Sequence, residues 1–95
     1  MVSCSLSGDE VDRIFQALGD ATRRDIVRRC ATRPLSITEL ASQYEMSFTA
    51  VRKHVTVLER AGLVHKERSG RETHVRVNEQ IVQRAADLLN LYTSR

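Results

Sequence analysis

Basic and hydroxyl side chains recur at helical spacing in the middle of this chain, where five of them stand three or four positions apart: Thr49, Arg52, Lys53, Thr56 and Arg60. Residues with this spacing lie on one face of an α-helix. No carboxylate stands among residues 47–58, so most of that face would be cationic. Rows of hydroxyl groups and cations suit hydrogen bonding to phosphates and neutralisation of their charge.

The same segment has an apolar face that would hold it against a core. Val51, Val55 and Leu58 lie opposite the cations, and Phe48 lies at the edge of this apolar sector. Ser47 can accept amide hydrogens at the start of the helix, and the glycine at position 62 can adopt the left-handed conformation that commonly closes one. These signals predict a helix over residues 48–61, about 21 Å long.

Charge is distributed unevenly along the 95 residues, whose formal net charge is +3. Residues 1–46 hold six cations and seven anions, residues 47–77 hold seven and three, and residues 78–95 hold two and two. The positive excess therefore lies in the middle third, as phosphate binding requires. A solvated surface without a partner is the alternative explanation.

Length and composition predict one small domain, residues 1–95, with a mostly aliphatic core, because only 4% of the residues are aromatic. No apolar run is long enough to span a membrane. The first residues, "MVSCSLSGDE", lack the basic start and apolar stretch of a signal peptide. We therefore expect a cytoplasmic protein.

Three further helices are predicted before the cationic segment. Asp20 can cap the second of them, and Pro34 ends it or lies just beyond it. Capping boxes, in which a serine is followed three residues later by a glutamate, begin the helices predicted over residues 8–18 and 37–44: Ser7 with Glu10, and Ser36 with Glu39.

After residue 62 the apolar spacing changes from helical to alternating, which predicts a β-hairpin. Val64 stands before the polar loop "RSGRE", and Val75 and Val77 stand after it. We expect Ser69-Gly70 to form the tight turn.

In chain order these elements read α-α-α-α-β-β-α, a mainly α fold with a small β-hairpin, the winged helix-turn-helix. A DNA major groove, about 12 Å wide, admits the helix over residues 48–61, and the preceding short helix would cross the backbone. Thr56 lies on the side of this helix that would face the groove. The hairpin would form the wing, and the cations around its tip would lie close to the phosphates beside the groove: Lys66, Arg68 and Arg71. As alternatives, the cationic helix face could be ordinary solvated surface, and the basic hairpin tip could protect a strand edge from pairing with another chain.

Two adjacent apolar stripes run along the last predicted helix, which Asn78 can cap. A terminal helix in so small a domain has one core to face, so we expect the surplus apolar surface to pair with a second copy of the chain. Packing within one chain is the alternative. The predicted homodimer interface combines residues of the first and last helices: Val11, Phe15, Leu18, Leu88, Leu89 and Tyr92.

Four stretches resemble the ArsR/SmtB family of bacterial winged-helix repressors: "FQALGDATRRDIV" at 15–27, "LSITELA" at 35–41, "MSFTAVRKHVTVLERAGLV" at 46–64 and "RSGRETHVRV" at 68–77. The third stretch is the most specific. The resemblance implies a homodimer that binds an inverted-repeat operator in double-stranded DNA and usually represses its own transcription unit until an inducer changes the dimer. It also implies a groove-facing set of residues: Ser47, Thr49, Ala50, Arg52, Lys53 and His54.

The chain departs from the family pattern where relatives sense metals. Ser36 and Thr38 stand where metal-sensing members place cysteines, and residues 78–95 contain no histidine for the other familiar site. Arg52 stands where many relatives carry serine. We therefore predict a repressor without the usual metal sites and without a cofactor.

Cysteine and histidine residues support two minor hypotheses. Cys30 lies on the apolar stripe of the second helix, where a free cysteine is most often a small buried hydrophobe. A thiol or soft-metal switch that joins Cys30 to Cys4 is the alternative. A turn at Ser69-Gly70 would also bring two residue pairs together as a metal site: His65 opposite His74, and Glu67 opposite Glu72.

The sequence shows no signature of an enzyme, since it has neither a Gly-rich phosphate loop nor a nucleophile elbow. A winged-helix scaffold can also serve as a protein-interaction module that does not bind DNA, which is the second functional class. Salt dependence separates the two classes. The logarithm of the affinity for DNA falls by roughly 0.9 per neutralised phosphate for each tenfold increase in salt concentration.

Overall fold

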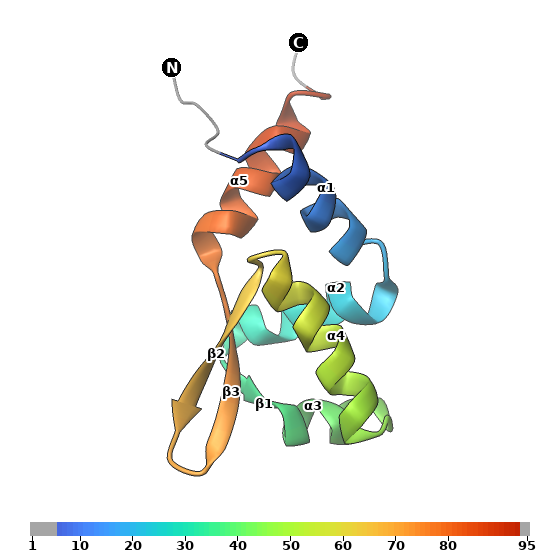
Figure 1. Ribbon diagram of the computed structural model, residues 1–95, viewed down its shortest axis with the longest axis vertical. Coiled ribbons are helices and arrows are strands. Elements are labelled where there is room, and N and C mark those ends of the chain that lie inside the picture. The colour runs from blue at the N-terminus through green and yellow to red at the C-terminus, as the bar shows by residue number, and fades with distance from the viewer. Residues whose placement is uncertain (1–5, 94–95) are drawn as a thin grey trace.

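Five helices and three strands make up the part of the chain that the structure, a computed structural model, describes, residues 6–93 (Figure 1). In chain order they are α1 (Gly8–Ala17), α2 (Ala21–Thr32), β1 (Leu35–Ser36), α3 (Ile37–Tyr44), α4 (Phe48–Arg60), β2 (Val64–Ser69), β3 (Glu72–Val77) and α5 (Glu79–Asn90). The molecule measures 45 × 25 × 23 Å. The helices α1 and α5 lie at one end of the long axis, and the hairpin tip lies at the other (Figure 1).

The starts of α1 to α4 confirm the capping predictions. The hydroxyl of Ser7 accepts from the Glu10 amide at 3.2 Å, and the Glu10 carboxylate accepts from the Ser7 amide at 2.7 Å. Ser36 forms the same box at α3, while Asp20 and Ser47 cap α2 and α4. The predicted ranges of α1, α3 and α4 agree with the structure to within one residue.

The hairpin turn lies one residue later than predicted. Ser69 pairs with Glu72, so Gly70 and Arg71 form the turn, in place of Ser69-Gly70. Gly70 is the first central residue of the turn and has a φ of +63°. Two-residue hairpin turns require a positive φ at that position. A turn with Ser69 in that position would have required a left-handed conformation of a serine, at a steric cost that glycine avoids.

Two other features differ from the prediction. The short strand β1 was not predicted, and it adds a third strand by pairing antiparallel with β3, Leu35 opposite Val75. Asn78 precedes α5 as predicted, but its side chain makes no capping hydrogen bond. Its backbone N–H donates instead to the carbonyl of Leu63, 2.9 Å away, which ties the start of α5 to the residue that precedes β2.

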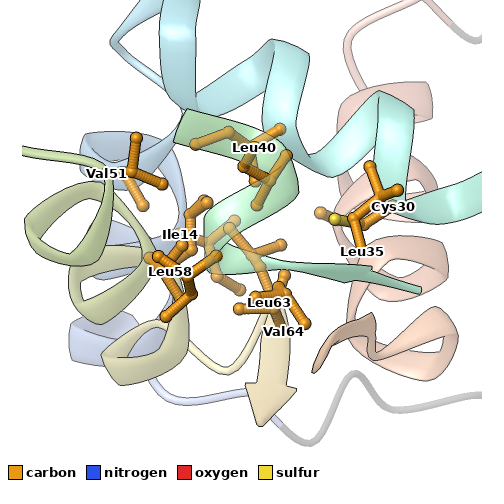
Figure 2. Close-up of a cluster of buried hydrophobic side chains, with 14 residues drawn as sticks. Ile14, Cys30, Leu35, Leu40, Val51, Leu58, Leu63 and Val64 are labelled. Carbon is orange, nitrogen blue, oxygen red and sulfur yellow. The ribbon is translucent and has the colours of Figure 1, made fainter. Parts of the chain in front are cut away.

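The core lies where the helices α1 to α4 meet the base of the sheet (Figure 2). Ile14, Leu40 and Leu58 converge there from α1, α3 and α4, each at most 1% exposed. In contrast, Ala85 is the single buried residue of α5. The core therefore anchors α4 firmly and leaves much of α5 uncovered. Within residues 6–93, no helix has the length and apolar character needed to cross a membrane.

Candidate nucleic-acid interface

The outward face of α4 is the cationic face that the residue spacing predicts. Thr49, Arg52, Lys53 and Arg60 are exposed and Thr56 is half-buried, whereas the opposite side of the helix is fully buried. Since the apolar side is anchored in the core, the helix cannot rotate these groups out of solvent without losing that burial. The prediction that they share one outward surface is confirmed.

The beginning of α4 carries the capping residue Ser47, whose hydroxyl accepts from the Ala50 amide at 3.1 Å. The first turn of the helix contains no acidic residue. The partial positive charge of the helix start is therefore not offset locally, and it favours an anion near Ser47, Thr49 and Ala50.

The turn between α3 and α4 is held by a backbone conformation that is unusual for its residue. Glu45 caps α3 with a φ of +54°, and the Met46 amide returns to the Ala41 carbonyl at 3.2 Å. The left-handed residue ends α3 and lets α4 start immediately after Ser47. The resulting pair of helices is the helix-turn-helix.

A polar network fixes α3 against α2. The carboxylate of Asp25 accepts hydrogen bonds from the Tyr44 hydroxyl at 2.6 Å and from Nε of Arg29 at 2.7 Å, and it also pairs with Arg28. These donors, Arg29 first, hold the pKa of Asp25 well below its ordinary value. Burial, followed by the contact with Asp25, raises the pKa of Tyr44. The network thereby helps to set the position of the helix that precedes α4.

The cations of the wing differ in their exposure and in whether they form ion pairs. Arg68 and Arg71 are exposed at the hairpin tip, and the structure gives neither an ion pair within the described residues. Lys66 points toward the helices instead, and its Nζ lies 3.6 Å from a carboxylate oxygen of Glu59. Arg76 pairs with Glu67 at 2.9 Å. The wing tip is therefore its most cationic part.

A groove separates the start of α4 from the wing. Arg52 of α4 and Arg71 of the hairpin lie on its two sides, and Lys66 also lines it. Phe48 contributes an aromatic wall, which differs from its predicted place at the edge of the core, since Phe48 is 48% exposed. The first turn of α4 and the wing thus form one continuous cationic surface.

His54 is placed differently from the groove-facing set to which the family resemblance assigned it. Its Nδ1 lies 3.4 Å from a guanidinium nitrogen of Arg23 and 3.8 Å from the Asp20 carboxylate, and its side chain is 21% exposed. It stands about 140° around the helix from Thr49, toward the core. Arg23, which sequence reasoning did not single out, also donates to the Ala17 carbonyl at 2.7 Å. His54 therefore joins α4 to the junction of α1 and α2.

The residues predicted to form a dimer interface fall into two groups. Val11, Phe15, Leu18 and Leu88 are half-buried within one chain, while Leu89 and Tyr92 are 51% and 79% exposed. The sequence reading missed Leu91, which is 70% exposed beside them. The end of α5 and the following turn thus carry a cluster of uncovered apolar side chains.

Neither minor hypothesis gains support from the described residues. Cys30 is 3% exposed, and burial raises the pKa of its thiol to about 11, which keeps it protonated and unreactive at neutral pH. Cys4, its suggested partner, lies outside the described residues.

The strand pairing assumed in the hypothesis of a metal site at the hairpin was wrong. The observed register puts His74 opposite Glu67 and His65 opposite Arg76, so the two histidines do not face each other. Across residues 6–93, no group of three or more potential ligands is placed to hold a metal ion.

Comparison with known proteins gives a consistent result. A family model described as a helix-turn-helix domain matches residues 13–67. The HTH-type transcriptional regulator Rv2034 of Mycobacterium tuberculosis is 51% identical over 53 residues, which are 56% of this chain and 50% of that protein. The uncharacterized HTH-type transcriptional regulator YuzN of Bacillus subtilis is 45% identical over 67 residues, 63% of this chain and 73% of YuzN. The chain thus spans half the length of the first relative and about three quarters of the second.

Solved structures agree with these relatives. An ArsR-like transcriptional regulator from Rhodococcus sp. RHA1 superposes with a TM-score of 0.80 at 29% identity, over 90% of this chain and 81% of that one. The homodimeric winged helix-turn-helix DNA-binding domain of Mb0332 from Mycobacterium bovis gives 0.76 at 22% identity, over 100% of this chain and 93% of that one. The second likeness, at such low identity, shows the fold alone.

Proposed function

The chain belongs to the ArsR family of helix-turn-helix transcriptional regulators, and on this basis we propose that it is a homodimeric repressor that binds an inverted-repeat operator. The observation that carries the proposal is the outward face of α4, which continues into the wing as one cationic surface. A duplex presents phosphates on both sides of its major groove, so a helix flanked by cations can enter it.

The proposed contacts divide by chemistry. Arg52 and Lys53 bind phosphate or guanine, because neither is occupied by a carboxylate within residues 6–93. Ser47, Thr49 and Ala50 lie at the start of α4, where they contact base edges or the backbone, with Thr56 about two turns further on.

Contacts from the wing are proposed to add affinity with little sequence choice. Arg68 and Arg71 are exposed at the hairpin tip and direct their charge toward phosphates or the minor groove. Lys66 is ion-paired with Glu59, so it contributes less to the affinity for DNA than the two arginines do. His54 is left out of the proposed contacts, because its ring lies against Asp20 and Arg23.

Dimerisation is proposed through α1 and α5. The uncovered Leu89, Leu91 and Tyr92 would be buried by a second copy related by a twofold axis, together with the half-buried residues already named. The Mb0332 domain, which shares this fold, is homodimeric. Such a dimer should present its two α4 helices about 34 Å apart, in successive major grooves.

We propose that regulation does not use the metal site that metal-sensing members of the family carry on the third helix. Ser36, which stands where metal-sensing members place a cysteine, is 2% exposed, and its hydroxyl is occupied by the Glu39 amide at 3.0 Å. A residue that is committed to capping α3 is not available as a ligand. The proposed repressor acts in the cytoplasm, where its operator lies.

The decisive test is selection of genomic DNA fragments by the purified protein, followed by footprinting of the enriched fragments. We expect an inverted repeat protected as two half-sites about 10 base pairs apart, or a multiple of that spacing. Sedimentation should show a dimer at micromolar concentration. Enrichment of no sequence, with affinity for nucleic acid that is independent of salt, would favour the protein-interaction module instead.

A further inference from the structure

Phe48 begins α4 and lies in the groove beside the wing, with 48% of its surface exposed. Most other large exposed hydrophobic residues in the described chain lie at the end of α5, and Val57 is the other one on α4. An aromatic ring left half in water loses the free energy of burial, so a partner that covers the ring gains it.

Arg52 stands one helical turn after Phe48. The central carbon of its guanidinium group lies 6.0 Å from the centroid of the Phe48 ring, at the outer range of a cation–π contact. Within residues 6–93 the structure gives Arg52 no ion pair with a carboxylate. The ring is therefore the neighbour that restrains the direction of the guanidinium group.

The charge of the groove indicates what covers the ring. Arg52, Lys66 and Arg71 line it against a single carboxylate, that of Glu72. An apolar peptide would have to desolvate Arg52 and Arg71 without compensation, because neither forms an ion pair within residues 6–93, whereas a duplex supplies phosphates for them and base edges for the ring. DNA is thus the occupant whose chemistry fits both the cations and Phe48.

We propose that Phe48 and Arg52 act as one recognition unit. Phe48 is a positioning residue: its ring holds the planar fork of Arg52 toward O6 and N7 of a guanine, the bidentate contact that specifies this base. The exposed part of the ring packs against the methyl group of a thymine in an adjacent base pair. This inference rests on the proposed DNA-binding function and adds a base preference to it.

The test uses the duplex that the parent protein enriches from a randomised library, changed in one half-site at a time. Replacing a guanine by 7-deazaguanine removes N7, and replacing a thymine by deoxyuridine removes only the methyl group. For the parent, we expect the guanine change to weaken binding by about fivefold or more, since a bidentate pair discriminates by about 5- to 150-fold. The thymine change should cost about fourfold, the effect of one buried methyl-sized group.

Variants of Phe48 separate the ring from its bulk. Phe48→Leu keeps an apolar side chain without a π face, so its response to 7-deazaguanine should shrink by about two- to fivefold. Phe48→Ala should lose the response to deoxyuridine as well. Phe48→Tyr retains the ring and should keep both responses. Val27→Ala, a truncation of a half-buried apolar residue of α2 that lines neither this groove nor the cationic face of α4, is the control and should respond like the parent.

Circular dichroism confirms that each variant is folded before its affinity is compared. Parent-like responses to both base changes in Phe48→Leu and Phe48→Ala would overturn the inference, as would a selected site in which no guanine responds to 7-deazaguanine. These outcomes leave the proposed function intact, because the parent still selects a site. Enrichment of no sequence by the parent would overturn both.

Discussion

Replacing Lys53 by alanine removes a charge that the proposed interface uses and the fold does not. The side chain is exposed on α4, and within the described residues no carboxylate pairs with it. Alanine is also a good helix former, so the helix itself loses nothing. The thermal midpoint should therefore stay within about 3 °C of the parent value.

The effect on DNA binding can be worked out from counterion release. Each neutralised phosphate contributes roughly 0.9 to the slope of log affinity against log salt concentration. In a homodimer Lys53→Ala removes two such contacts, so the slope should become shallower by roughly 1.8. Between about 50 and 200 mM salt, the parent should then lose roughly 12-fold more affinity than the variant does.

Fluorescence anisotropy of a labelled operator duplex, titrated at several salt concentrations, measures this slope. Arg84→Ala is a suitable control, because it removes an exposed cation from α5, outside both the face of α4 and the wing. Its slope should match that of the parent. If a folded, dimeric Lys53→Ala protein kept the parent slope, the assignment of Lys53 to a phosphate or base contact would be refuted.

Three further changes test other parts of the structure. Leu91→Asp places a charge on the uncovered end of α5, so sedimentation at micromolar concentration should show monomers; an unchanged dimer would place the interface elsewhere. Tyr44→Phe removes a 2.6 Å hydrogen bond to Asp25 and should cost roughly 1 kcal/mol, or about 4–8 °C in thermal midpoint. Because the folded-state pKa of Asp25 is depressed, this loss should be full at pH 7 and should shrink only as the pH falls through that depressed pKa, well below the ordinary value of 3.8, which thermal melts across pH can show. Cys30, with its thiol pKa raised to about 11 by burial, should resist alkylation at pH 7 until denaturant is added, and peptide mass mapping that found rapid native-state labelling would contradict its burial.

The helix boundaries could be predicted from the amino-acid sequence, because their signals are local. A capping serine and the glutamate three residues later act within one turn, so Ser7 and Ser36 mark the starts of α1 and α3 whatever surrounds them. The cationic face of α4 follows in the same way from residue spacing and the 3.6-residue period. Local order of this kind was enough to predict the winged helix-turn-helix.

The hairpin register and the third strand depend on tertiary packing. Glycine at position 70 favours the observed turn locally, but the residues of β2 and β3 that pair also depend on which pairing the core accepts. Strand β1 exists because Leu35 meets Val75, a residue 40 positions further along the chain. Such a partner cannot be read from neighbouring residues.

The same reason explains the side chains whose roles changed. The family resemblance placed His54 among the groove-facing residues, but Asp20 and Arg23, at the start of α2, lie against its ring. Lys66 belongs to the basic wing in the sequence, yet in the fold its ammonium group lies 3.6 Å from the carboxylate of Glu59 on α4. Periodicity specifies which way a side chain leaves its own helix or strand, while its partners come from segments that only the packed core brings within a few ångströms.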